Sequence, residues 1–223
     1  MITLTNVEPQ GSEARLSGIG FTPDAFPEAK SSKTGVSVRY VESSDKQWYV
    51  FRASYGRVDK ASDFLIDSGT YTYVAKKYVE RYVRGRKKKF LQPLIPNIIF
   101  AYTSEAKADE YVSNTPELSY LSYYFNHFEL DEYNRNPPLI VPIWEMRRFV
   151  QLTSNKNKHL LFIKPSQCHY KSGELVKVID GPFEGVEGMV ARVSGQQRVV
   201  VSITNLGLVS TAYVPTAFLK KIE

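Results

Sequence analysis

The pattern of hydrophobic and polar residues divides the chain into three parts, of which the first is the least regular. Over residues 1–45 the hydrophobic positions are irregularly spaced, and Gly, Ser, Pro and charged residues dominate between Glu8 and Gly35. A segment of this composition buries too little apolar surface to offset the entropy lost on ordering. We therefore expect residues 1–45 to form a weakly ordered extension, with a short strand at 36–41.

Residues 46–153 alternate between strand-like and helix-like patterns. Residues 48–54 combine aromatic and β-branched side chains, which favour strands. Val58, Ala61 and Leu65 then recur at helical spacing, and Gly69 stands where a glycine commonly ends a helix. This alternation predicts an α/β domain. Its further elements are expected as extended chain at 71–83, a buried strand at 98–102, a helix at 105–114, a strand at 120–128 and a helix at 142–152.

Residues 171–223 contain short strands separated by glycine turns. Val176 and Val178 alternate with polar or mixed positions, which predicts a strand with one buried face. Asp180-Gly181-Pro182 ends this strand, because glycine permits positive φ and proline removes a backbone donor. Strands this short and closely spaced predict a small all-β, SH3-like barrel. A linker at 154–170 is expected to join it to the α/β domain.

An ordered set of residues in this barrel resembles the KOW motif, a small β-barrel element of ribosomal proteins and transcription elongation factors. Taken singly, its glycines are explained equally well as hairpin turns. Their order and spacing together are far more specific, and they point to the machinery of gene expression rather than to metabolism. The set comprises Gly173, Gly181, Phe183, Gly185, Gly188 and Val190.

Two segments of the α/β domain are similar to the N-terminal domain of the NusG family. Trp48-Tyr-Val-Phe-Arg52, followed by Tyr55-Gly56-Arg57 and a helix, resembles the opening of that domain. Residues 83–97 resemble its basic hairpin and the Pro-Leu-Phe-Pro strand that follows, with Ile95 where phenylalanine is usual. The resemblance covers residues 46–223. The extension and the long linker are more similar to the specialised paralogues of the UpxY type, which act at surface-polysaccharide operons.

The resemblance implies a non-enzymatic transcription elongation and antitermination factor. Its N-terminal domain is expected to bind the clamp helices of RNA polymerase across the DNA channel, and its KOW domain to recruit a partner, NusE or Rho. A ribosome-associated RNA-binding protein is the alternative, because KOW barrels also occur there. The barrel argues against this alternative, since its basic and acidic residues nearly balance.

The resemblance also implies contact residues for these protein partners. Ile98 and Phe100 share a strand face and match positions that form an apolar cavity for the clamp helices, although ordinary core packing explains the pattern equally well. Phe183, on the loop between the first two barrel strands, matches the phenylalanine on the surface that meets NusE or Rho. An aromatic side chain folded back over the end of the barrel is an equal alternative.

Positive charge is densest between Lys76 and Gln92, where Glu80 is the one acidic residue. Exposed cations at this density attract phosphate, so we expect the hairpin to contact nucleic acid in the elongation complex. A solvated hairpin that only keeps the protein soluble is the alternative. The residues expected to make the contact are Arg84, Arg86, Lys87, Lys88 and Lys89.

Composition narrows the remaining possibilities. The net charge of +6 is compatible with work near nucleic acid. Cys168 is the one cysteine, the three histidines lack metal-ligand spacing, and no phosphate-loop or zinc-protease motif occurs. We therefore expect no catalytic residue, cofactor or metal. The sequence has no apolar run of the roughly 18 residues that a membrane helix needs and no signal-peptide pattern at its start, which favours a cytoplasmic protein without membrane contact.

Overall fold

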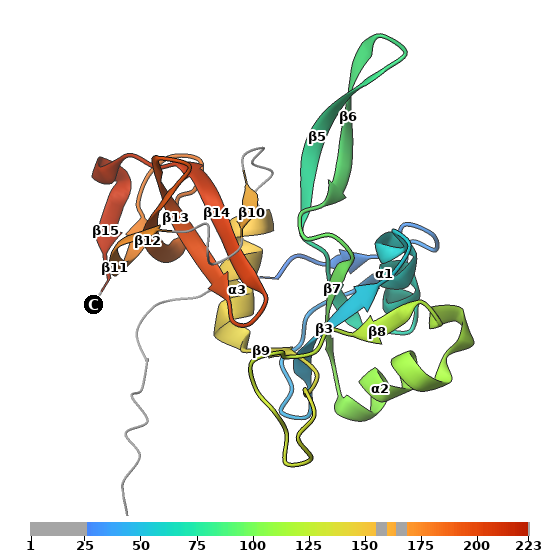
Figure 1. Cartoon of the computed structure of the whole chain (residues 1–223). Helices are drawn as coiled ribbons and strands as arrows, with labels where there is room; N and C mark the ends of the chain where they lie inside the picture. The colour runs from blue at the N-terminus through green and yellow to red at the C-terminus, as the bar shows by residue number, and fades with distance from the viewer. Residues whose placement is uncertain (1–25, 155–159, 164–168, 223) are drawn as a thin grey trace, which may run out of the picture.

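A computed structural model describes residues 26–154, 160–163 and 169–222. It contains two sheets of substantial size and a long separate hairpin (Figure 1). The N-terminal domain is built on a five-stranded antiparallel sheet in the order β4-β7-β3-β8, with β9 also paired to β3. These strands are β3 (Gln47–Ala53), β4 (Tyr71–Tyr73), β7 (Ile98–Thr103), β8 (Leu121–Tyr123) and β9 (Ile140–Val141).

Helices cover both faces of this sheet, because its central strands are apolar on both sides. Tyr49, Phe51 and Ile99 lie on one face, which packs in a core with residues of α1 (Val58–Asp67) and α2 (Glu105–Asp109). A π-helical turn, Glu110–Asn114, and a short 3₁₀ helix, Pro116–Leu118, continue α2 towards β8. The other face carries Val50 and Phe100 and packs against α3 (Ile143–Ser154). The predicted α/β domain is confirmed.

The N-terminal extension is more ordered over residues 26–45 than its composition predicts. Two short strands, β1 (Ala29–Lys30) and β2 (Ser37–Val38), pair with each other. Phe26 and Tyr40 stack on Trp48, with ring centroids 5.3 and 5.8 Å away. The Tyr102 hydroxyl also donates to the Ser43 carbonyl at 2.8 Å. These contacts join residues far apart in the chain, so local composition gave no sign of them. Residues 1–25 lie outside the described residues.

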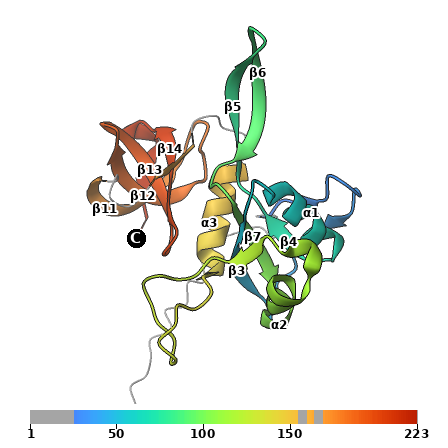
Figure 2. The same cartoon turned by 45° about the vertical axis from the view of Figure 1, so that its right-hand side comes forward.

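The hairpin of β5 (Lys76–Val83) and β6 (Arg86–Pro93) forms a two-stranded ribbon of its own that extends away from the sheet (Figures 1 and 2). The strands pair in register along their whole length, from Lys76 opposite Pro93 to Val83 opposite Arg86. Arg84 and Gly85 form the turn, with φ of +51° and +73°. A two-residue turn with both φ values positive matches the right-handed twist of the strands that it joins.

The C-terminal sheet has six strands in the order β10-β14-β13-β12-β11-β15, and it confirms the predicted β-rich, SH3-like domain. Its strands are β10 (Leu161–Ile163), β11 (His169–Val178), β12 (Glu187–Val193), β13 (Gln196–Ile203), β14 (Gly207–Tyr213) and β15 (Leu219–Lys221). A 3₁₀ turn, Thr216–Phe218, precedes β15.

The segment predicted as a linker, 154–170, contributes to this sheet instead of only connecting the domains. β10 pairs with β14, and β11 already begins at His169. The Phe162 ring packs against the backbone of Gly207. A side chain at position 207 would place its Cβ atom 2.6 Å from that ring. This close approach explains why residue 207 is a glycine, and the contact holds β10 against β14. Such a contact depends on β14, more than forty residues downstream, and could not be deduced from the linker sequence.

Candidate functional site

The register of the β5–β6 hairpin separates its cations between two faces. Paired residues of an antiparallel ribbon point to the same side, and neighbours along a strand point to opposite sides. One face therefore carries Lys77, Arg81, Arg86 and Lys88, together with Val79, Val83, Phe90 and Gln92, and contains no acidic residue. We call it the cationic face. The opposite face, here the mixed face, carries Lys76, Tyr78, Glu80, Tyr82, Lys87, Lys89 and Leu91.

Ion pairs lower the effective charge of the mixed face. Lys76 Nζ lies 2.7 Å from an Asp59 carboxylate oxygen of α1, and Lys87 Nζ lies 2.5 Å from Glu80 Oε2. On the cationic face, Arg81 donates a hydrogen bond to the neutral side chain of Gln92 at 3.0 Å, which orients the guanidinium without reducing its charge. The positive potential of the hairpin is therefore strongest on the cationic face.

The structure divides the residues predicted to contact nucleic acid. Arg86 and Lys88 lie on the cationic face, Lys87 and Lys89 on the mixed face, and Arg84 in the turn. Lys77 and Arg81 were outside the predicted set, yet they share the cationic face. The alternation of side chains within each strand would have predicted that Lys77 and Arg81 share this face, if the pairing of the two strands had been known. The nucleic-acid contact itself stays a prediction.

Ile98 and Phe100 lie in the core between the sheet and α3. Their relative exposures are 5% and 1%, and the Phe100 ring lies 5.1 Å from that of Phe149 on α3. In this conformation they pack as ordinary core residues, which was the alternative explanation of their pattern. A partner helix reaches them only if α3 moves, so their role in polymerase binding stays a prediction.

A hydrogen-bond chain fastens the C-terminal part of α3 to the same face of the sheet. The Thr153 hydroxyl donates to the Phe149 carbonyl at 2.7 Å. The Tyr73 hydroxyl lies 2.7 Å from Thr153 Oγ1. Because the Thr153 proton is already used, Tyr73 is the donor in this second bond. Burial raises the pKa of Tyr73 to about 12, which keeps this hydroxyl protonated at physiological pH. The chain helps to keep α3 over Phe100.

Phe183 is buried rather than exposed on its loop. It follows β11 in the turn that leads to β12, and its relative exposure is 4%. The expectation of an exposed aromatic anchor is therefore wrong for this conformation, because the apolar ring packs in the core that both domains share. Partner binding through Phe183 stays a prediction, and it requires a change that uncovers the ring.

The barrel packs against α3, which lies between the two sheets (Figures 1 and 2). The buried Glu145 carboxylate accepts hydrogen bonds from the backbone N–H of Thr204, at 2.8 Å, and from its hydroxyl. Gln151 donates to the Gly185 carbonyl at 2.7 Å, two residues from Phe183. Arg148 lies 3.8 Å from the buried Glu187 carboxylate of β12. One side of α3 thus covers Phe100 while the other contacts the barrel.

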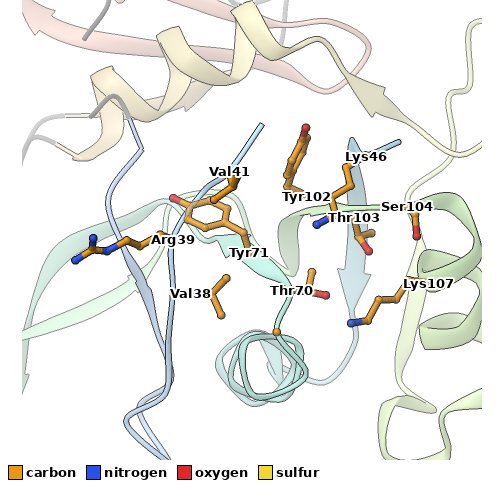
Figure 3. A pocket seen from close by; sticks show the side chains of 11 residues that line it. Val38, Arg39, Val41, Lys46, Thr70, Tyr71, Tyr102, Thr103, Ser104 and Lys107 are labelled. Carbon is orange, nitrogen blue, oxygen red and sulfur yellow. The ribbon is translucent and has the colours of Figure 1, made fainter. Parts of the chain in front are cut away.

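A small pocket of about 180 Å³ lies beside the N-terminal extension (Figure 3). Lys46 and Lys107 approach it from different elements, and Lys107 Nζ donates to the Ser68 carbonyl at 2.8 Å. The residues that line this pocket include no histidine, cysteine or acidic residue. Its lining combines Lys46 and Lys107 with the aromatic rings of Tyr71 and Tyr102.

Comparison with protein families matches residues 46–157, half of the chain, to the family described as transcription termination factor nusG. The chain belongs to the NusG family. Residues 172–202 match the KOW motif, so the predicted order of a NusG N-terminal domain and a KOW domain is confirmed. NusG-family domains of this kind are those of a transcription elongation or antitermination factor. A comparison with curated proteins finds no match.

Two further features are absent from the described residues. Among them, no group of three or more His, Cys, Asp and Glu side chains is arranged to hold a metal ion. No helix in the described part of the chain is both long enough and apolar enough to cross a membrane. His159 and Cys168, two of the residues considered in the sequence, lie outside the described residues.

Proposed function

We propose that this NusG-family protein binds transcribing RNA polymerase through its N-terminal domain and suppresses pausing or termination. The hairpin supplies the observation that carries the proposal: a paired ribbon extends from the domain, and one of its faces carries Lys77, Arg81, Arg86 and Lys88 without an acidic residue. Such a face fits the phosphate backbone of nucleic acid held by the polymerase. The clamp helices are the proposed protein contact of the domain.

The proposed mechanism is a shift in the balance between polymerase states. A protein that bridges the clamp across the DNA channel stabilises the closed, active state only by binding it more tightly than the open state. No bond to the substrate nucleotide is made or broken by the protein. Ile98 and Phe100 are proposed to meet the clamp helices, which requires α3 to move from the position that it occupies here.

The KOW domain is proposed to recruit a second protein, NusE or Rho, through the surface around Phe183. Phe183 is buried in a core that includes residues of both domains, so recruitment requires a change that uncovers the ring. We propose that this change is release of the barrel from α3, which would uncover the Phe183 loop and free the outer side of the helix. A helix freed on that side moves more easily away from Phe100, so the two proposed binding events are expected to favour each other.

The specialised UpxY type is the proposed branch of the family, which would place the protein at surface-polysaccharide operons. The N-terminal extension supports this proposal, because residues 26–45 form an integral layer on Trp48 and Tyr102 instead of a dispensable tail. The cytoplasm is the proposed site of action, where the polymerase works.

The direct test is binding and transcription with purified components. We expect the full-length protein to co-elute with core RNA polymerase on gel filtration, and to shorten pauses when it is added to elongation complexes. Purified ribosomes serve as the rival ligand, since the alternative is a ribosome-associated RNA-binding protein. Co-elution with ribosomes and not with polymerase would replace the proposed function by that alternative.

A further inference from the structure

The loop between β8 and β9, residues 124–139, exposes large apolar side chains on a short stretch of chain. Phe128, Leu130 and Tyr133 have relative exposures of 76%, 59% and 68%. Single exposed apolar residues are normal on protein surfaces, but a cluster on one projecting segment usually marks an interaction site. We call these three side chains the apolar tip of the loop.

Polar bonds, and not the apolar tip, hold this loop in shape. The buried Asn126 side chain accepts from the Phe128 backbone N–H at 3.0 Å and donates to Glu129 Oε2 at 2.8 Å. Asn136 closes the base of the loop by donating to the Asn126 carbonyl at 2.8 Å. These bonds fix the backbone that carries Phe128 without using its ring.

A second group of bonds surrounds Asp131 at the far end of the loop. Its carboxylate accepts from the backbone N–H groups of Tyr133, at 2.9 Å, and Arg135, at 2.8 Å, and pairs with the Arg135 guanidinium at 3.2 Å. The Arg135 guanidinium lies over the Tyr133 ring, 5.0 Å from its centre. The tip is thus preorganised, which lowers the conformational entropy that binding would cost.

The charge of the loop decides what kind of partner it fits. Glu129, Asp131 and Glu132 stand among the apolar residues, and Arg135 is already paired with Asp131. Carboxylates at this density repel phosphate, so a nucleic-acid strand does not fit the tip. A protein surface with an apolar hollow and basic side chains around it complements both features.

The loop and the hairpin project from opposite ends of the N-terminal domain (Figures 1 and 2). If the hairpin lies on nucleic acid in the elongation complex, the loop points away from that contact. This orientation suits a contact with protein rather than with the nucleic acid.

We propose that the apolar tip, Phe128, Leu130 and Tyr133, is a second polymerase-binding surface, which docks into a basic-rimmed apolar hollow of the enzyme. The proposal rests on the proposed function. It adds a contact separate from Ile98 and Phe100 and independent of any movement of α3, because the three side chains are already exposed.

The test compares the affinity of full-length variants for purified core RNA polymerase by fluorescence anisotropy. The variant Phe128→Ser/Leu130→Ser/Tyr133→Ser is expected to bind at least about tenfold more weakly than the unmodified protein, since exposed aromatic anchors contribute most to such contacts. Its melting temperature should be unchanged, because the Asn126 and Asp131 bonds remain. Tyr213→Ser removes a comparably exposed ring from the barrel and serves as the matched control, with an expected change under twofold.

A photoreactive phenylalanine analogue at position 128 adds a direct readout, and it should cross-link to a polymerase subunit. Affinity of the triple variant within twofold of the unmodified protein would overturn the tip contact while leaving the proposed function intact. Failure of the unmodified protein to bind polymerase would overturn both. A third outcome would assign the tip to a second copy of the chain. In this outcome the unmodified protein self-associates in sedimentation, and the triple variant does not self-associate but keeps its affinity for polymerase.

Discussion

At the scale of single residues, three carboxylates occupy three different environments in this fold. Glu145 is a carboxylate inside an interface, and it is tolerated because Thr204 donates to both of its oxygens. Glu187 has cations on two sides, Arg148 at 3.8 Å and Lys177 at 3.5 Å. Asp131 is different, since it is a surface carboxylate whose hydrogen bonds shape a loop.

The charge of Asp131 makes the shape of the loop depend on pH. The backbone N–H of Arg135, followed by that of Tyr133 and the Arg135 charge, holds the pKa of this carboxyl below its usual 3.8. A depressed pKa in the folded state means that the stabilisation is complete above pH 3.8 and is lost as the pH falls through the lower, folded value. We expect the amide NMR shifts of Tyr133 and Arg135 to titrate with a midpoint below 3.8.

The variant Asp131→Asn is the control for this titration, because it keeps an acceptor oxygen and removes the ionisable group. Its Tyr133 and Arg135 amides should show no transition in the same range. A midpoint at or above pH 3.8 in the unmodified protein would mean that the carboxylate does not hold the loop.

At the scale of elements, the β5–β6 hairpin illustrates how pairing turns a run of cations into a directed surface. The sequence places its cations in both strands, and only the register puts Lys77 beside Gln92 and Arg81 beside Lys88. The acids that neutralise the other face come from Glu80 within the hairpin and from Asp59 on α1. One face is consequently the better match to phosphate.

Two variants that each remove three charges separate the faces. We expect Lys77→Gln/Arg86→Gln/Lys88→Gln to weaken binding to a polymerase elongation complex and to reduce the dependence of log K on log salt, by about 0.9 for each phosphate that the protein no longer neutralises. The matched variant Lys76→Gln/Lys87→Gln/Lys89→Gln removes partly paired cations and should change the slope much less. If the two variants lowered the affinity and the salt slope equally, the hairpin would act through its total charge alone.

At the scale of the whole molecule, α3 couples the two domains. Its inner side packs on Phe100, and its outer side meets the barrel through Glu145, Arg148 and Gln151. An aromatic ring proposed for partner binding, Phe183, is buried in the core that these contacts complete. The docking of the barrel therefore covers the outer side of α3 in this conformation.

Removing the bonds across this interface should release the barrel. In Glu145→Ala/Gln151→Ala, the Thr204 backbone N–H and the Gly185 carbonyl no longer have their partners. A bond to the charged Glu145 is worth about 1.5–3 kcal/mol and the neutral Gln151 bond about 0.5–1.5 kcal/mol. We expect ¹⁵N relaxation to show the barrel tumbling independently, with the amides around Phe183 shifted and the barrel still folded. Arg147→Ala is the matched control, because Arg147 lies on the same helix but pairs with Glu42 at 2.9 Å. If the barrel of the double variant showed the same ¹⁵N relaxation rates as in the unmodified protein, apolar packing alone would hold the domains together.

The sequence by itself determined the elements, the order of the two domains and the family. Aromatic and β-branched composition predicts β3, alternation with a period of two predicts β11, and helical spacing predicts α1, because each depends only on neighbours a few residues away. The KOW glycines belong to the same class of signal, since Gly181 and Gly185 take positive φ in local turns. The density of cations in the hairpin was equally visible.

Tertiary structure alone decided which of these residues are accessible. Phe183 is buried because it packs in a core that includes residues of both domains, Phe26 and Tyr40 are ordered because Trp48 lies within stacking distance, and the hairpin cations separate because two strands pair in one register. Each result depends on contacts between residues far apart in the chain. Their energies belong to the packed arrangement, so no local pattern of side chains encodes them.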